Sequence, residues 1–228
     1  MSTVIRLPLT CRCLLPIFLP LLLSACTENK AYETAICTLA DVSGTYADEK
    51  PRVAGIIKAG VLPAMDPGDS LFFITIDSNS FNEENLKYKT MLDYRPSRAN
   101  RQKLEFANSL DSFAGASTHS GFTDISGAMM LCSDYLKSTG SGNQLMFIFS
   151  DMAEDLKPGV TRSFQDNEFT GMHIAAMNVI KLARDSSDPA VYRSRLQAWR
   201  DRVTGAGAAD WQVIYEAAKI PEFIDKAR

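Results

Sequence analysis

Short runs of almost entirely apolar residues, each ending abruptly in polar ones, alternate along this chain with longer segments of helical periodicity. The runs Leu71–Ile76 and Leu145–Phe149 contain no charged residue, and strands of that kind are covered on both faces in a folded protein. Other segments of similar character are also predicted to be strands. These are Thr34–Ala40, a strand within Met172–Leu182, Trp211–Tyr215, and a weakly alternating edge strand within Asn85–Tyr94.

The segments between these strands carry apolar residues three or four positions apart, which is the spacing of one face of an α-helix. The expected helices are Arg52–Met65, Ala99–Phe113, Ile125–Leu136, Ala190–Val203 and a terminal helix. Strands that alternate with helices predict an α/β fold with a three-layer, doubly wound, mainly parallel sheet and helices on both faces. In such sheets, ligands bind where loops diverge at the carboxyl ends of the strands.

The first 25 residues have the composition of an export signal. They combine two arginines, no acidic residue and an apolar run from Leu14 to Leu23. That run is about ten residues long, whereas a membrane-spanning helix needs roughly 20. We therefore expect residues 1–25 to be a signal peptide that is removed.

The segment Leu23-Ser24-Ala25-Cys26 resembles the lipobox of bacterial lipoproteins. The resemblance implies that Cys26 becomes the lipid-modified N-terminus and that residues 26–33 form a lipidated tether to the membrane. Thr27, rather than aspartate, follows the cysteine, and by the lipoprotein sorting rule this implies the outer membrane, facing the periplasm. An ordinary secretory signal that happens to end at Cys26 is the alternative.

Residues 34–228 have the length of one domain with its own core. The formal net charge of the chain is −3, and nothing in its composition indicates nucleic-acid binding. The tether is at most roughly 28 Å long when fully extended. The domain is therefore expected to stay close to its membrane, with the carboxyl ends of the strands facing away from the lipid.

Short oxygen-bearing side chains follow two of the predicted strands and precede one helix. Asp41, Ser43 and Thr45 leave the first strand at alternate positions, Asp151 follows Leu145–Phe149, and Thr123 stands just before a helix. All five would lie at the binding edge of the sheet. Hydroxyls and carboxylates without histidine or cysteine suit a hard divalent cation, with Mg²⁺ preferred and Mn²⁺ or Ca²⁺ as alternatives.

At these residues the sequence resembles the von Willebrand factor A domain family. The metal-ion-dependent adhesion site (MIDAS) of that family is written Asp-x-Ser-x-Ser, then Thr, then Asp, and here it reads Asp41-Val42-Ser43-Gly44-Thr45, then Thr123, then Asp151. The resemblance covers roughly residues 33 to 217. Two positions depart from the pattern, since Thr45 replaces a serine and Met152 stands where many relatives have glycine.

The resemblance implies a role for each site residue. Ser43, Thr45 and Thr123 would supply hydroxyl oxygens to the ion, while Asp41 and Asp151 would act mainly through water or through hydrogen bonds to the hydroxyls. Neutral ligands leave the ion electrophilic. The ion could then take an acidic side chain from a protein partner, so the chain is expected to be a recognition protein and not an enzyme.

Two other functions remain open at this point. A magnesium-dependent phosphohydrolase could use Asp41 as its nucleophile, because Asp-x-Asp-x-Thr after a first strand is similar to haloacid-dehalogenase-type phosphatases. Here Ser43 replaces the second acid, which removes the expected general acid/base. A metal-free structural scaffold is the other alternative.

Cys37 and Cys132 are the two cysteines outside the signal and the lipid-attachment position. Cys37 precedes Asp41 on its strand, and Cys132 follows Thr123 on its helix, each by about 13 Å. The matching depth permits a disulfide, but two buried thiols would give the same sequence pattern.

Four acidic residues near the site, Asp48, Asp124, Glu154 and Asp155, could form an acidic rim around it but are interpreted as solvated loop charges. The two histidines, His119 and His173, are far apart in the sequence and are not expected to be catalytic or to bind zinc. A solvent-exposed helix face is expected to carry Arg193, Arg195, Arg200 and Arg202.

Overall fold

The computed structural model describes residues 32–180, 182, 185 and 188–228. The predictions for the signal at 1–25, for Cys26 and for the tether up to residue 31 therefore lie outside the described residues. No helix within the described part of the chain combines the length and the apolar character needed to cross a bilayer.

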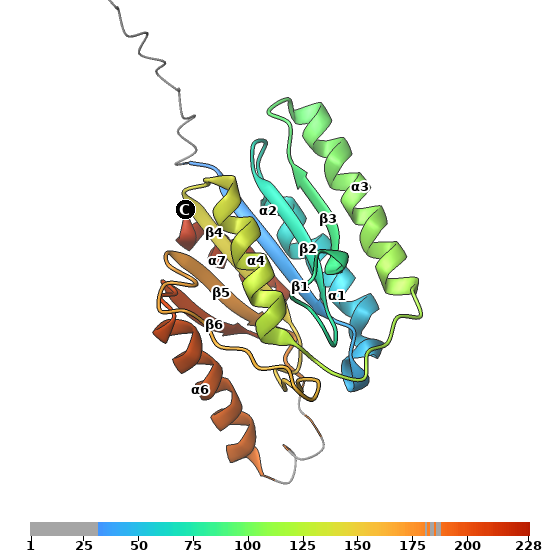
Figure 1. The fold of residues 1–228 in the computed structure, drawn as a ribbon. Coiled ribbons are helices and arrows are strands. Elements are labelled where there is room, and N and C mark those ends of the chain that lie inside the picture. The colour runs from blue at the N-terminus through green and yellow to red at the C-terminus, as the bar shows by residue number, and fades with distance from the viewer. Residues whose placement is uncertain (1–31, 181, 183–184, 186–187) are drawn as a thin grey trace, which may run out of the picture.

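Six strands form one sheet in the order β3-β2-β1-β4-β5-β6 (Figure 1). All neighbouring strands run parallel except β3, which is antiparallel to β2 at one edge. This confirms the predicted edge strand. The strands are β1 Thr34–Asp41, β2 Ser70–Ile76, β3 Leu86–Met91, β4 Asn143–Phe149, β5 Met172–Met177 and β6 Asp210–Ile214.

Helices cover both faces of the sheet, as the sequence predicted. One face packs against α4 (Ile125–Thr139) and α6 (Pro189–Gly205). The other face packs against α1 Lys50–Ile56, α2 Leu62–Ala64, α3 Pro96–Gly115 and α7 Ile220–Ala227. A π-helical turn, Ile57–Val61, joins α1 to α2, and short 3₁₀ turns lie at Gly44–Glu49, Glu83–Asn85 and Ala217–Lys219.

The strand β1 shows how one segment supplies two cores. All its residues are buried, and its side chains alternate, with Ile36 and Ala40 in the core beneath α1 and α3, and Cys37 and Leu39 in the core beneath α4. A strand that lies between two helical layers needs apolar residues on both faces. The predicted three-layer, doubly wound fold is therefore confirmed.

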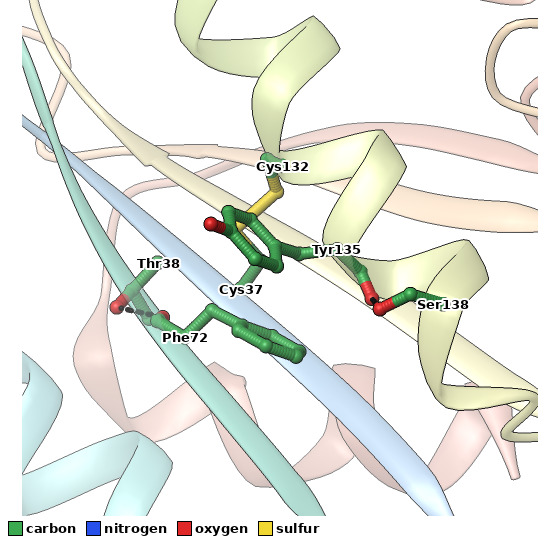
Figure 2. Close-up of a disulfide and its surroundings, with 6 residues drawn as sticks. All are labelled: Cys37, Thr38, Phe72, Cys132, Tyr135 and Ser138. Atoms are coloured by element: carbon green, nitrogen blue, oxygen red, sulfur yellow. Dashed lines mark hydrogen bonds between the residues drawn. A yellow bond between two sulfur atoms is a disulfide. The ribbon is translucent and has the colours of Figure 1, made fainter. Parts of the chain in front are cut away.

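A disulfide joins Cys37 of β1 to Cys132 of α4, with their Cα atoms 6.1 Å apart (Figure 2). Beside it, the rings of Phe72 and Tyr135 stack with centroids 5.2 Å apart. The Thr38 hydroxyl donates to the carbonyl oxygen of Phe72 at 3.1 Å. The disulfide and the ring stack hold α4 against the middle of the sheet, the Thr38 bond joins β1 to β2, and the same helix begins at the predicted site.

The connection from β4 to β5 departs from the strand-helix alternation. Residues 150–171 contain turns and extended segments but no helix. Phe164 and Phe169 pack edge to face with their ring centroids 4.7 Å apart, and Phe169 is fully buried. The loop is thus held in place by its own side chains and borders the carboxyl edge of the sheet.

Candidate metal centre

The site lies where the carboxyl ends of β1 and β4 meet the start of α4. Asp41 is the last residue of β1, and Ala40 pairs with Phe149 of β4. This register places the residues after β4, starting with Ser150, beside Asp41. Thr123 comes from a different segment and stands two residues before α4.

A chain of hydrogen bonds connects three of the predicted ligands. The Thr123 hydroxyl donates to Ser43 Oγ at 2.5 Å. Ser43 Oγ in turn donates to Asp41 Oδ1 at 2.5 Å, and the Ser43 amide donates to the same oxygen at 2.8 Å. Residues 80 positions apart in the sequence therefore share one hydroxyl cluster.

Asp151 lies at the same rim. With Ser43, Gly44, Gly121 and Thr123, it lines an open cavity of about 540 Å³. Its Oδ1 accepts a hydrogen bond from the Ala153 amide at 2.8 Å. Thr45 lies in the 3₁₀ turn that follows β1, and its side chain is outside the described residues. The structure thus brings together the side chains of Asp41, Ser43, Thr123 and Asp151.

Ser150 belongs to this cluster and was not predicted from the sequence. Its hydroxyl donates to Asp41 Oδ2 at 2.7 Å, while its oxygen accepts from the Met152 amide at 3.0 Å. The sequence feature that could have indicated it is its position immediately after β4, at the carboxyl edge of the sheet. Both carboxylate oxygens of Asp41 therefore accept a hydroxyl proton.

Met152 explains why glycine is not required after Asp151. Its φ angle is 61°, in the left-handed region that glycine adopts most easily. Its side chain is fully buried in the core beneath α4 and α6, and its carbonyl oxygen accepts from Trp199 Nε1 at 2.8 Å. The departure from the family pattern keeps a backbone conformation typical of glycine and adds a packing contact.

Asp124 is not a solvated loop charge, so that interpretation was wrong. It is fully buried, caps α4 by accepting from the Gly127 amide at 2.8 Å, and forms an ion pair with Arg162 at 2.7 Å. The neighbouring Thr123 exchanges two backbone hydrogen bonds with Asp155, at 2.8 and 3.0 Å. The backbone of Thr123 is therefore held by Asp155 of the loop between β4 and β5.

Two arginines of α6 and the loop residue Glu154 were also wrongly interpreted as solvated charges. Arg202 binds Glu154 at 3.2 Å and Ser126 Oγ at 2.6 Å, and Glu154 also accepts from the Ser126 amide at 2.7 Å. Arg195 binds the buried Asp185 at 2.6 Å. The contacts of Arg202 and Glu154 tie α6 and α4 to the loop that carries Asp151, while Arg195 ties α6 to the segment after β5. Asp48 and Asp155, in contrast, are exposed as expected.

Burial raises the pKa of Asp41 to about 6. Hydrogen bonds from the Ser43 side chain, the Ser43 backbone and Ser150 oppose this shift, while the negative charge of Asp151 adds to it. Asp41 forms no ion pair with any lysine or arginine in the described part of the chain. A buried carboxylate without a neighbouring cation is unfavourable unless something else supplies positive charge.

The donor set fits a hard cation. The Thr123 hydroxyl donates its hydrogen bond to Ser43, so the lone pairs of its oxygen remain available to coordinate a cation. Hydroxyl and carboxylate oxygens are the groups that Mg²⁺ and Ca²⁺ bind. His119 is exposed in the preceding loop, and His173 lies at the amino-terminal end of β5, away from this rim.

Comparison with known proteins supports the fold. No family model and no curated protein matches the chain. Several solved structures, however, match the chain in fold. BatB, a conserved hypothetical protein from Bacteroides thetaiotaomicron, is 11% identical with a TM-score of 0.50, and the match covers 86% of this chain and 98% of BatB.

Two further matches also cover 86% of this chain. An aerotolerance-related membrane protein from Bacteroides fragilis NCTC 9343 is 8% identical over 98% of its length, with a TM-score of 0.49. A von Willebrand factor type A protein from Catenulispora acidiphila is 10% identical over 42% of its length, with a TM-score of 0.47. Identities this low concern the fold alone. With its strand order and its covered, mainly parallel sheet, this chain has the doubly wound α/β fold that its resemblance to the von Willebrand factor A domain family implied, and it shares that fold with BatB.

Proposed function

We propose that this chain is a lipid-anchored recognition protein of the cell envelope that holds a divalent cation, Mg²⁺ in preference to Mn²⁺ or Ca²⁺, and binds an acidic side chain of a protein partner. The observation that carries the proposal is the Ser43 hydroxyl, which is hydrogen-bonded to Thr123 and to Asp41 beside the cavity that Asp151 lines. Three segments that are far apart in the sequence thus place hydroxyl and carboxylate oxygens beside one open cavity.

In this proposal, the neutral and the charged residues of the site would have different roles toward the ion. Ser43, Thr45 and Thr123 would offer neutral hydroxyl oxygens, and Asp41 and Asp151 would compensate the charge of the ion from farther away. Such a cation stays electrophilic and attracts a further anionic oxygen. The open cavity gives a carboxylate of a partner access to this position. No catalytic step is part of the proposal, and the chain is not proposed to be an enzyme.

The same proposal places the protein on a membrane through a lipid on Cys26, at the outer membrane and facing the periplasm. The strand β1 begins at Thr34, close to that anchor in sequence, and ends at Asp41. Its two ends lie at opposite edges of the sheet, so a membrane at the amino-terminal edge would leave the metal centre directed toward soluble or opposing partners.

The decisive experiment is thermal unfolding of the full chain, purified in detergent, with and without MgCl₂, MnCl₂ or CaCl₂. At one hundred times the dissociation constant, a bound ion stabilises the folded state by about 3 kcal/mol, or roughly 8 °C for a chain of this size. Asp41→Ala and Asp151→Ala should lose this shift. Asp48→Ala, an exposed neighbour, should keep it.

Calorimetric titration of the same proteins with each salt provides the second measurement. The wild-type protein and Asp48→Ala should bind one ion, and the two site variants should bind none. Traces that are indistinguishable among all four proteins would reject the metal centre and leave the metal-free scaffold.

A further inference from the structure

The two edges of the sheet differ in how they are protected against pairing with another chain. An exposed edge strand is commonly shielded by lysines, prolines or β-bulges. The strand β3 carries Lys87 and Lys89, and its pairing with β2 shifts register between Phe73 and Ile74. The strand β6 reads Asp-Trp-Gln-Val-Ile and has neither lysine nor proline. Among the strands that the structure describes, it pairs with β5 alone and forms the other edge of the sheet (Figure 1). One side of its backbone therefore has no partner strand in the described part of the chain.

Grooves flank β6 on both faces of the sheet. One has a volume of about 510 Å³ and lies between β6 and α6. The other has a volume of about 440 Å³ and lies between β6 and α7. Gln212, Val213 and Tyr215 line both. The two grooves therefore meet along the outer edge of β6, and alternate side chains of an added strand would enter one groove or the other.

The charges of the two grooves are unequal. In the groove beside α7, Lys226 pairs with Asp210 at 2.8 Å and Lys219 pairs with Glu222 at 2.9 Å. The groove beside α6 is lined by Arg193 and Arg200, which form no ion pair with any residue in the described part of the chain, and by no carboxylate. Both arginines are exposed. This groove therefore favours acidic side chains.

We propose that the outer edge of β6 binds an extended segment of a partner protein as an added strand, with acidic side chains at alternate positions facing Arg193 and Arg200. Backbone hydrogen bonds along β6 would supply affinity, and the two arginines would select the sequence. With five residues in β6, the paired segment would be about 17 Å long. This surface is separate from the metal centre and goes beyond the proposed function.

The test uses the full chain in detergent with EDTA, so that metal-bound carboxylates do not contribute. The probes are fluorescent decapeptides of alternating valine and glutamate, or of alternating valine and lysine. Fluorescence anisotropy should show the glutamate peptide binding at least about tenfold more tightly than the lysine peptide. Two further glutamate peptides are N-methylated on one or the other alternate set of residues. Only one set of amides faces β6, so one of these should bind and the other should not.

Variants locate the binding surface. Arg193→Glu with Arg200→Glu should weaken binding of the glutamate peptide by roughly tenfold, whereas Lys87→Glu with Lys89→Glu on β3 should leave it unchanged. Hydrogen exchange should show protection of the β6 amides when the peptide is bound.

Several outcomes would overturn the proposal. They are no binding of the glutamate peptide, equal binding of the lysine peptide, equal binding of both N-methylated peptides, and protection outside β6. A dimer in sedimentation whose β6 amides are already protected from hydrogen exchange without peptide would overturn it as well.

Discussion

Two buried aspartates at the carboxyl edge of the sheet are stabilised in opposite ways. Asp41 is 1% exposed and Asp124 is 0% exposed. Asp124 receives the Arg162 guanidinium together with the amides of Ser80 and Gly127. Asp41 receives two hydroxyl protons and one amide, and no cation from the described residues. One carboxylate is neutralised within the protein, and the other keeps an uncompensated charge beside an open cavity.

The first arrangement recurs where an aspartate has a structural role. Asp69 near the start of β2 pairs with Arg228 at 3.0 Å, and Asp185 pairs with Arg195 at 2.6 Å. A buried carboxylate normally has such a partner because desolvation of the charge is expensive. The fold could have supplied one for Asp41 as well. The cation that we propose for this site would supply that missing positive charge.

The largest expected effect tests the neutralised aspartate. Arg162→Leu should lower the free energy of unfolding by about 4 kcal/mol, because it leaves the Asp124 carboxylate buried without its cation. Urea unfolding monitored by circular dichroism measures the change. The double variant Asp124→Asn with Arg162→Leu is the control. Asparagine can still cap α4, so most of the stability should return. A loss below about 0.5 kcal/mol in the single variant would contradict this account of Asp124, because that is the scale of ordinary surface substitutions.

The next effect has the opposite sign. Asp41→Asn should raise the stability of the metal-free protein by about 2 kcal/mol at neutral pH, because it removes a buried charge that has no cation. The same variant should lose the stabilisation by Mg²⁺. Unfolding in EDTA and in MgCl₂ gives both quantities. A variant less stable than the wild type in EDTA would show that the Asp41 charge is already compensated within the protein.

The pH dependence of that gain follows from the pKa of Asp41. The folded protein raises this pKa from 3.8 to about 6, so the folded state binds the proton more tightly than the unfolded state does. The contribution of Asp41 to stability is therefore present below pH 3.8 and is lost as the pH rises through about 6. In EDTA, the difference between Asp41→Asn and the wild type should be small at pH 4 and reach its full size by pH 7. A difference independent of pH would contradict the assignment.

The smallest effect concerns Ser150. Ser150→Ala removes the hydroxyl that donates to Asp41 Oδ2, which should lower metal-free stability by about 1 kcal/mol. Affinity for Mg²⁺ should fall only by roughly tenfold, because Asp41 keeps its bonds to Ser43. Calorimetric titration measures the affinity. Complete loss of binding would make Ser150 as important as the predicted ligands.

Much of the fold could be predicted because each element is encoded locally. The apolar runs of β2 and β4 require cover on both faces, and the structure places them within one residue or two of the expected bounds. The positions of Asp41, Thr123 and Asp151 also followed from local pattern, because each stands within two residues of the end of a strand or the start of a helix. The parallel direction of the strands is enough to place their carboxyl ends at one edge of the sheet.

The partners of the charged residues could not be predicted in this way. Asp124 and Arg162 are 38 positions apart and Glu154 and Arg202 are 48 apart, and both pairs depend on the course of a loop that has no regular periodicity. A charged residue on a loop or helix looks solvated until the segment that covers it is known. The sequence interpretation of Asp124, Arg195 and Arg202 failed for this reason.

The sequence alone determined the alternation of strands and helices and the set of oxygen-bearing residues at one edge, because hydrophobic periodicity and strand direction act over a few neighbouring residues. Only the tertiary structure decided which of the carboxylates at that edge has a cation. Electrostatic compensation depends on distances between segments that are far apart in the chain. Asp41 and Asp124 are therefore the same residue type, but only Asp124 has an arginine partner among the described residues.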